Sequence, residues 1–301
     1  MPEPLLETPF LEKLERLTIH WQKSLPGLVG GHNTSRFAGS GQEFLDHRHF
    51  HHGDDLRAVN WRAYMRLEKL FLKMFQLEPR IPVRVLLDIS QSMAAGGQSN
   101  NAAGGGPKFD YARKLAAALC YIGLVRLDSI CLQPFTSKLG DAFTASGGRH
   151  RFQPAVNFLS ALPAGGKTNF LEVARQFLTE YPQRGLVLMI SDFLDDADPE
   201  RPLQYLADFG HELMLVQVWA DEDRQPPWEG ELELEDAETG QKMELAFDAD
   251  ARARYTAEFD EYCEHLERVA LRNSGRYVGL ATSVAVEQAV FSSLVTSGVL
   301  Q

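Results

Sequence analysis

The sequence predicts an α/β protein with a doubly wound, mostly parallel sheet. From residue 83 onward, short apolar runs alternate with helical stretches, which is typical of consecutive strand and helix units around a parallel sheet. Residues 185–191 (GLVLMIS) carry no charge, as expected of a strand buried on both faces. Residues 115–125 (LAAALCYIGLV) carry none either, so we expect a helix that is packed on most of its surface.

The chain is expected to divide near Arg80, between two prolines that interrupt regular structure. Residues 1–80 then form an N-terminal segment and residues 81–301 form the sheet domain. In the first segment we expect a covering helix over residues 5–20, extended strands over 42–50 and 71–82, and an element over 56–70 that fits a helix or a strand equally well.

The sheet domain contains the remaining elements. Strands are expected over residues 83–89, 128–136, 185–191, 212–220 and 276–281. Helices are expected over residues 108–127, 151–162, 169–181 and 201–209, followed by a long amphipathic helix ending at Asn273 and a final helix. A β-hairpin insertion is expected at about residues 229–247, and the glycine- and alanine-rich run Ala94–Pro107 predicts a flexible loop.

Composition narrows the class of protein. With 301 residues, of which 44% are apolar, the chain can bury a substantial core. The formal charge of −11 disfavours binding to nucleic acids, because such proteins need a cationic face against the phosphates. Cys120, Cys131 and Cys263 are scattered and form no C-x-x-C pair, so neither a disulfide framework nor a zinc ribbon is indicated.

Hydropathy and the first residues suggest a compartment. The apolar runs fall well short of a membrane span, and the first residues are too rich in glutamate for a signal peptide. We therefore expect a soluble, cytoplasmic protein.

The stretch VRVLLDISQSM delivers one carboxylate and two hydroxyls to the end of a buried strand. In open α/β sheets, ligands bind beyond the carboxyl ends of the strands, which is where Asp88 is expected. Ser90 and Ser92 follow at alternate positions, so their oxygens can converge on one face of a turning backbone. Hard oxygen ligands of this kind suit Mg²⁺.

Two further residues are expected at the same edge. Asp192 follows the strand over residues 185–191, and Thr168 follows a glycine turn at the start of a helix. Taken alone, an aspartate at a strand end with serines in the next turn is ordinary capping chemistry. The combination with Thr168 and Asp192 favours a metal site.

These residues resemble, in order and in context, the metal-ion-dependent adhesion site of the von Willebrand factor A domains. The resemblance covers residue 83 to the C-terminus. It implies that Ser90, Ser92 and Thr168 bind a cation directly, while Asp88 and Asp192 act largely through water. It also implies that an acidic side chain of a partner protein completes the metal shell. The cation expected is Mg²⁺, with Mn²⁺ or Ca²⁺ as alternatives.

The preceding stretch resembles the signature of the bacterial domain-of-unknown-function family fifty-eight. The matching residues are Glu43, Phe44, Arg48, Phe50, Gly53, Asp54, Asp55, Arg57, Trp61 and Arg66. His52, Met65 and the long loop after Met93 depart from the family pattern. Members of this family are often encoded beside MoxR-type AAA+ ATPases, so the resemblance implies such an ATPase as the partner, in protein assembly or remodelling.

The N-terminal segment also contains polar clusters. Gly53 allows a tight turn, and Asp54 and Asp55 are interpreted as part of an internal network of charges with nearby arginines. A cluster of histidines raises the alternative of a transition-metal site, but alternation along a strand would place His52 on the opposite face from the others, which are His47, His49 and His51. Exposed polar residues are therefore the expectation there.

Enzyme classes find little support in the sequence. The run GGKT resembles the end of a phosphate-binding loop, but Ala161 stands where its first glycine is required. Ser90 stands where a haloacid-type phosphatase needs its acid, and no G-x-S-x-G motif is present. We therefore expect a non-enzymatic, Mg²⁺-dependent protein-binding module. The alternative is a metal-dependent hydrolase that uses the same cation site or the segment around Asp54 and Asp55.

Overall fold

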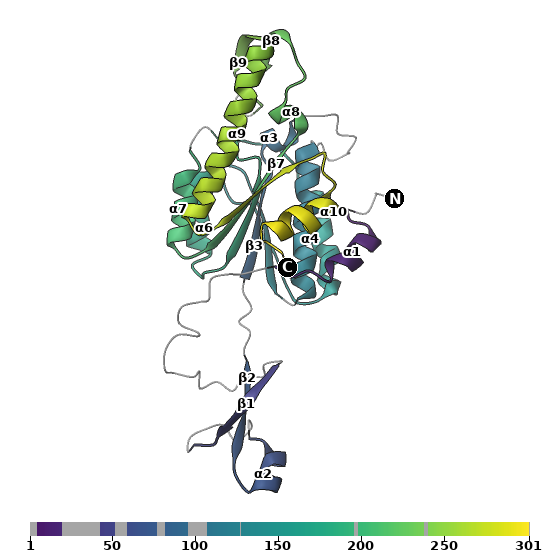
Figure 1. Ribbon diagram of the computed structural model, residues 1–301, viewed down its shortest axis with the longest axis vertical. Coiled ribbons are helices and arrows are strands. Elements are labelled where there is room, and N and C mark those ends of the chain that lie inside the picture. The colour runs from purple at the N-terminus through teal and green to yellow at the C-terminus, as the bar shows by residue number, and fades with distance from the viewer. Residues whose placement is uncertain are drawn as a thin grey trace. The chain divides into compact units, whose positions relative to one another are not determined.

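A computed structural model defines the fold (Figure 1). It describes residues 5–19, 43–51, 59–76, 82–95, 107–126, 128–195, 198–237 and 240–300. The chain forms two compact units, of which one comprises residues 1–21 and 81–301 and the other residues 22–80.

The larger unit is built on a six-stranded sheet with the strand order β10-β7-β6-β3-β4-β5. Its strands are β3 (Pro82–Asp88), β4 (Ser129–Phe135), β5 (Phe143–Ser146), β6 (Leu186–Ser191), β7 (Glu212–Trp219) and β10 (Arg276–Ala281). All neighbours pair in parallel except β4 and β5, which are antiparallel. The predicted fold class, a mostly parallel α/β sheet, is confirmed. The edge strand β5 was not predicted, because its four residues contain no apolar run.

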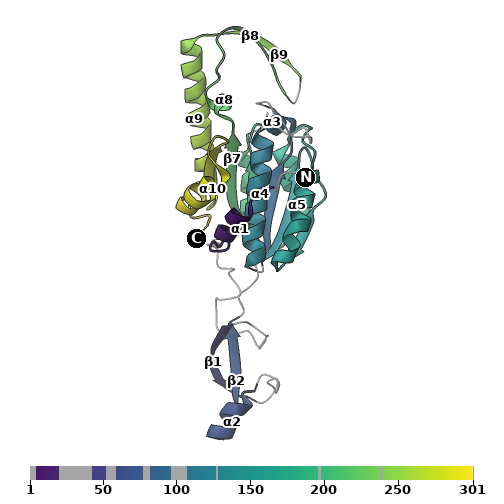
Figure 2. The ribbon, with the colours of Figure 1, turned by 90° about the vertical axis from the view of Figure 1, so that its right-hand side faces the viewer.

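Helices cover both faces of this sheet (Figures 1 and 2). One face carries α1 (Thr8–Leu14), α4 (Pro107–Val125), α5 (Phe152–Ala161) and α10 (Val286–Gln288), which continues into a π-helical turn over Ala289–Leu294. The other face carries α6 (Phe170–Glu180), α7 (Glu200–Asp208) and α9 (Ala249–Arg272). Each layer of helices forms its own hydrophobic core with the sheet.

Alternation along β3 explains the two cores. Val83, Val85 and Leu87 point into the core beneath α4, whereas Leu86 points into the core beneath α6. The uncharged helix α4 packs closely on the sheet. A Cβ at Gly123 would lie 2.2 Å from Cδ1 of Ile130, so a larger residue there would require the Ile130 side chain to move.

The first helix belongs to the sheet unit, which differs from the expected grouping of residues 1–80. Phe10 and Leu14 of α1 are buried in the core that α4 shares. The hydroxyl of Tyr121 donates to Oε1 of Glu15 at 2.9 Å, and Nε of Arg126 donates to the carbonyl oxygen of Leu17 at 3.1 Å. The apolar face of the helix is stabilised by burial against α4, so it lies with the sheet although it is separated from it in sequence.

The smaller unit contains an antiparallel pair, β1 (Glu43–His49) and β2 (Phe71–Gln76), and the helix α2 (Trp61–Leu67). Both strands fall where the sequence predicts extended structure. The ambiguous stretch over residues 56–70 contains α2, whose start is capped by Asn60, which accepts a hydrogen bond from the amide of Ala63 at 3.2 Å.

An excursion between β7 and α9 projects from the sheet unit (Figure 2). It begins with the short helix α8 (Asp221–Arg224) and continues as the hairpin of β8 (Gly230–Glu235) and β9 (Lys242–Phe247). This hairpin lies within the range that the sequence predicts. Among the described residues, no helix has both the length and the apolar character needed to cross a bilayer.

Candidate metal centre

The candidate site lies where the connections of the sheet change direction. After β3 the chain crosses to β4 on one side, whereas β6 pairs with β3 on the other side. Leu87 lies beside Ile190 in the register, so the carboxyl ends of β3 and β6 meet. Such a switch point is the usual ligand-binding position in open α/β sheets.

Asp88 is the last residue of β3 and is fully buried. Its Oδ1 accepts a hydrogen bond from the amide of Ser90 at 2.8 Å, and its Oδ2 accepts one from the hydroxyl of Ser191 at 2.5 Å. Burial, followed by the nearby charge of Asp192, raises the pKa of Asp88 to about 7. The donors that hold this carboxylate are neutral, so its negative charge is not compensated by a cationic side chain among these contacts.

The two serines of the motif converge as expected. Ser90 precedes the short helix α3 (Gln91–Ala94), and its hydroxyl oxygen lies 2.9 Å from that of Ser92. The Ser92 hydroxyl donates to Oδ1 of Asp192 at 3.2 Å. Adjacent ligands of an octahedral Mg²⁺ are separated by about 3 Å, given metal–oxygen distances of about 2.1 Å. The spacing of these oxygens therefore fits such an ion.

The loop that carries Thr168 is joined directly to the Asp88 turn. The amide of Gly165 donates to the carbonyl oxygen of Ile89 at 2.7 Å, and the amide of Gln91 donates to that of Gly166 at 2.8 Å. Gly166 has a φ of +97°, a backbone conformation that residues with a Cβ rarely adopt. Thr168 is 1% exposed. The two hydrogen bonds bring its loop to the same edge of the sheet.

Asp192 follows β6, and the next residue has an unusual backbone. Gln217 donates to the carbonyl oxygen of Asp192 at 3.2 Å, and the amide of Leu194 donates to its Oδ1 at 3.2 Å. Phe193 has a φ of +59°, which is uncommon for a bulky residue. Its ring is buried and stacked on that of Phe170, with 5.5 Å between centroids. This packing offsets the local strain beside the site.

The donor set fits a hard divalent cation. All the predicted residues are buried, and they supply two carboxylates and three hydroxyls from three loops. Asp88, Ser90, Ser92 and Asp192 are linked by contacts of the side chains or of the adjoining backbone, and Thr168 lies in a loop bonded to them. Such oxygen ligands are those that Mg²⁺, Mn²⁺ and Ca²⁺ prefer.

Three residues around the site were not predicted from the sequence. Ser191 orients Asp88, Lys108 contacts Asp192, and Asp223 contacts Lys108. One signal was present for Lys108, which begins a helix. A cation in the first turn opposes the helix dipole, so its presence there indicates a compensating anion. No local pattern indicates Ser191 or Asp223.

The comparison of sequences identifies the family. A profile described as "Protein of unknown function DUF58" matches residues 46–264, which is most of the chain. The chain belongs to the DUF58 family. This DUF58 protein is 24% identical over 238 residues to Uncharacterized protein Rv1480 of Mycobacterium tuberculosis, covering 78% of this chain and 73% of the relative. It is also 31% identical over 111 residues to Uncharacterized protein MAV169 of Mycobacterium avium, covering 36% of this chain and 65% of the relative.

Solved structures resemble the DUF58 protein distantly. BatB from Bacteroides thetaiotaomicron matches with a TM-score of 0.41 and 16% identity, over 72% of this chain and 98% of that one. Proximal thread matrix protein 1 from the mussel byssus, in a structure whose metal-ion-dependent adhesion site holds zinc, matches with a TM-score of 0.32 and 12% identity, over 46% of this chain and 35% of that one.

The alternative metal site in the N-terminal segment gains no support from the described residues. Gly53, Asp54, Asp55 and His52 lie outside them, as do the side chains of residues 43–47. Within the described part, His49 packs against Phe71 with 4.6 Å between ring centroids, and Nδ1 of His51 lies 3.0 Å from Nη1 of Arg48. Neither histidine side chain meets another metal ligand in these contacts.

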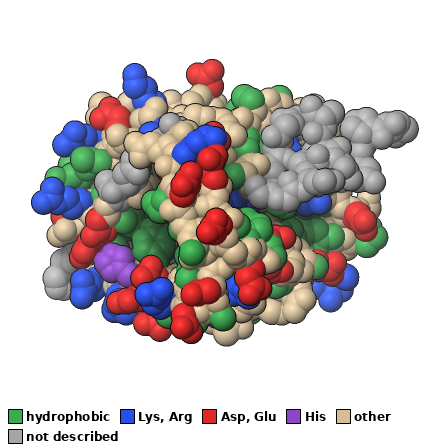
Figure 3. Space-filling model, turned by 90° about the horizontal axis from the view of Figure 1, so that it is seen from above, with side chains coloured by type: hydrophobic (Ala, Val, Ile, Leu, Met, Phe, Trp, Pro, Cys, Tyr) green, Lys and Arg blue, Asp and Glu red, His purple; other side chains and the backbone are tan. Residues whose placement is uncertain are grey.

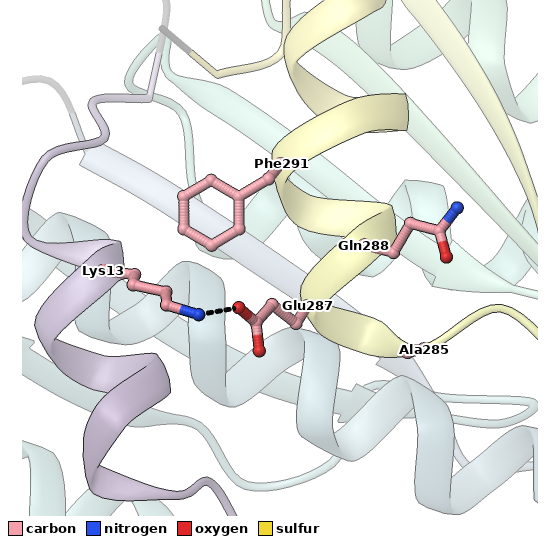
Figure 4. A pocket seen from close by; sticks show the side chains of 5 residues that line it. All are labelled: Lys13, Ala285, Glu287, Gln288 and Phe291. Atoms are coloured by element: carbon pink, nitrogen blue, oxygen red, sulfur yellow. Dashed lines mark hydrogen bonds and ion pairs between the residues drawn. The ribbon is translucent and has the colours of Figure 1, made fainter.

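Two other features of the DUF58 protein contain none of the predicted metal ligands. Asp198, Glu200 and His265 bring ligand atoms within 4.8 Å of one another, but the Asp198 carboxylate already caps the amide of Glu200. A surface pocket of about 450 Å³ lies between α1 and α10 and is crossed by the ion pair of Lys13 and Glu287 (Figure 4). None of the predicted metal ligands lines this pocket.

Proposed function

We propose that this DUF58 protein is a non-enzymatic, Mg²⁺-dependent protein-binding module. The observation that carries the proposal is the convergence of buried oxygen donors from three loops at one edge of the sheet. Ser90, Ser92 and Thr168 would bind the ion directly, and Asp88 and Asp192 would orient its shell. Mn²⁺ or Ca²⁺ would use the same donors.

The partner would complete the metal shell with an acidic side chain. The chain has a formal charge of −11, and many acidic side chains, with basic ones among them, lie on the end of the sheet unit that carries α3 and the hairpin (Figure 3). A carboxylate that approaches this end is repelled unless a cation lies between the two proteins. Electrostatics thus supports a recruitment step that depends on the metal.

The partner proposed is a MoxR-type AAA+ ATPase, which the family resemblance implies, and the compartment proposed is the cytoplasm. In this proposal the DUF58 protein acts as an adaptor that presents the ATPase with proteins to assemble or remodel. The warrant is analogy within the family.

The chemistry of the neighbouring groups supports binding over catalysis. Among the described residues, the side chains that contact Asp88 and Asp192 are serine hydroxyls and the amine of Lys108. The amine of Lys108 is held between two carboxylates, which raise its pKa although burial alone would lower it. A lysine that stays charged is a poor general base. We expect purified protein with Mg²⁺ to show no phosphatase or nucleotidase turnover above that of an Asp88→Ala variant. Turnover that this substitution abolishes would favour the hydrolase alternative.

A pull-down with purified proteins tests the proposal. The full chain is immobilised and offered the MoxR-type ATPase of the same organism, once with Mg²⁺ and once with chelator. The Asp88→Ala variant is tested in the same way with Mg²⁺. A matched control, Asp208→Ala, removes an exposed carboxylate from α7. We expect capture with Mg²⁺ by the natural chain and the control only. Equal capture under all conditions would remove the cation from the mechanism.

A further inference from the structure

A lysine lies inside the candidate metal centre. Lys108 is the second residue of α4, and its side chain is only 3% exposed. Its Nζ lies 2.9 Å from Oδ2 of Asp192 and 3.1 Å from Oδ2 of Asp223. Burying an ammonium group is costly unless it is paired, and the two carboxylates stabilise this buried charge.

The two carboxylate oxygens of Asp192 have different partners. Oδ2 contacts Lys108, whereas Oδ1 accepts the hydroxyl of Ser92, one of the predicted metal ligands. Asp88 differs, because its two hydrogen-bond donors, the amide of Ser90 and the hydroxyl of Ser191, are neutral. The built-in positive charge therefore acts on one of the two carboxylates.

The second carboxylate that holds the lysine belongs to the excursion that carries the hairpin. Oδ2 of Asp223 also accepts the amide of Ala220 at 2.9 Å, which caps α8. The hydroxyl of Tyr255 on α9 donates to the carbonyl oxygen of Asp223 at 2.7 Å. These bonds hold Asp223 in place. Its carboxylate therefore shares the positive charge of Lys108 with Asp192, which weakens the attraction between Lys108 and Asp192.

We propose that Lys108 is a resident cation that sets the divalent-ion affinity of this site. It neutralises Asp192 when no metal is bound, which keeps the buried carboxylates compatible with the fold. When a divalent ion is bound, the same positive charge repels it and holds the affinity below what the oxygen donors alone would provide. The inference rests on the metal site of the proposed function and concerns how strongly that site binds.

Two substitutions are expected to shift metal affinity in opposite directions. Lys108→Met keeps the length of the side chain and removes the charge, so divalent ions should bind at least about tenfold more tightly. Asp223→Asn leaves Lys108 paired with Asp192 alone, so binding should weaken severalfold. A purely structural role for either residue would weaken binding in both variants.

The experiment titrates the full chain with MgCl₂ by calorimetry and with Mn²⁺ by electron paramagnetic resonance. Lys114→Met, an exposed lysine on the same helix, is the matched control and should bind as the natural chain does. Melting temperatures in chelator form a second readout. Without metal, the melting temperature of Lys108→Met should lie below that of the natural chain. Added Mg²⁺ should raise it by more than it raises that of the natural chain, because the carboxylates of the variant have no other cation.

The outcomes separate this inference from the proposed function. If the natural chain binds neither ion, the metal site itself is wrong. If the natural chain binds but Lys108→Met binds equally or more weakly, the site stands and the resident-cation role is overturned. If Lys108→Met does not fold, Lys108→Gln decides, because it also removes the charge but can still donate hydrogen bonds to the carboxylates. Equal or weaker binding in that variant overturns the inference.

Discussion

The hydroxyl of Ser92 donates a hydrogen bond to Oδ1 of Asp192 at 3.2 Å, across a separation of 100 residues in the sequence. The contact is possible because β3 and β6 are adjacent in the sheet although α4, β4, β5, α5 and α6 lie between them in the chain. It joins the loop that follows β3 to the loop that follows β6. Substitutions in either loop, or in the neighbouring loop of Thr168, should therefore affect one common property, which is affinity for a divalent ion.

Added Mg²⁺ should stabilise the natural chain against unfolding. The ion would compensate two buried carboxylates, and an ion present at 100 times its dissociation constant adds about 2.7 kcal/mol to the free energy of unfolding. Thermal unfolding with increasing Mg²⁺ measures the effect, and Asp88→Ala should abolish it. A melting temperature that stays constant up to millimolar Mg²⁺ would contradict the prediction.

Thr168→Ala should weaken divalent-ion binding at least about tenfold, because it removes a proposed direct ligand. Thr179→Ala is the matched control, since Thr179 is exposed and its hydroxyl donates to the carbonyl oxygen of Arg175 on its own helix. Calorimetric titration of both variants with Mg²⁺ checks the prediction. Equal affinities in the two variants would place Thr168 outside the metal shell.

Ser191→Ala should lower both stability and metal affinity. The Ser191 hydroxyl donates to Asp88 and accepts the amide of Phe193 at 2.8 Å, and both contacts are buried. Leaving such groups without a partner costs about 1–3 kcal/mol. Denaturant unfolding in chelator measures the loss of stability, and metal titration then measures the misplacement of Asp88. A variant with unchanged stability and affinity would show that Ser191 does not position the carboxylate.

Gly166→Ala should disturb the site through the backbone alone. At a φ of +97° an added Cβ is strained, although it would meet only Thr136, at 3.5 Å. The strain should cost about 1–3 kcal/mol or shift the loop. Gly240→Ala is a control with a positive φ of +70° and open space around its Cβ, far from the site in the hairpin turn. Metal affinity should fall in Gly166→Ala and stay unchanged in Gly240→Ala. An unchanged affinity in Gly166→Ala would contradict a role for the loop.

Much of this site could be predicted because all its predicted residues except Thr168 follow strands. The uncharged run before Asp192 and the apolar run before Asp88 indicate strands of a parallel sheet, and such strands place their carboxyl ends at one edge. Lys108, Ser191 and Asp223 could not be predicted in the same way. A lysine, a serine and an aspartate occur on most protein surfaces, and only burial and contact distinguish these three.

The sequence by itself determined the α/β class, the succession of most strands and helices along the chain, and the list of candidate oxygen donors. Periodicity and composition record these features locally, residue by residue. The tertiary structure decided the order of the strands within the sheet, which brings Ser92 to Asp192. It decided the pairing that buries Lys108 against that aspartate. It also decided that α1 packs on α4. Such choices depend on which distant surfaces bury each other, and that free energy belongs to pairs of segments and not to any one of them.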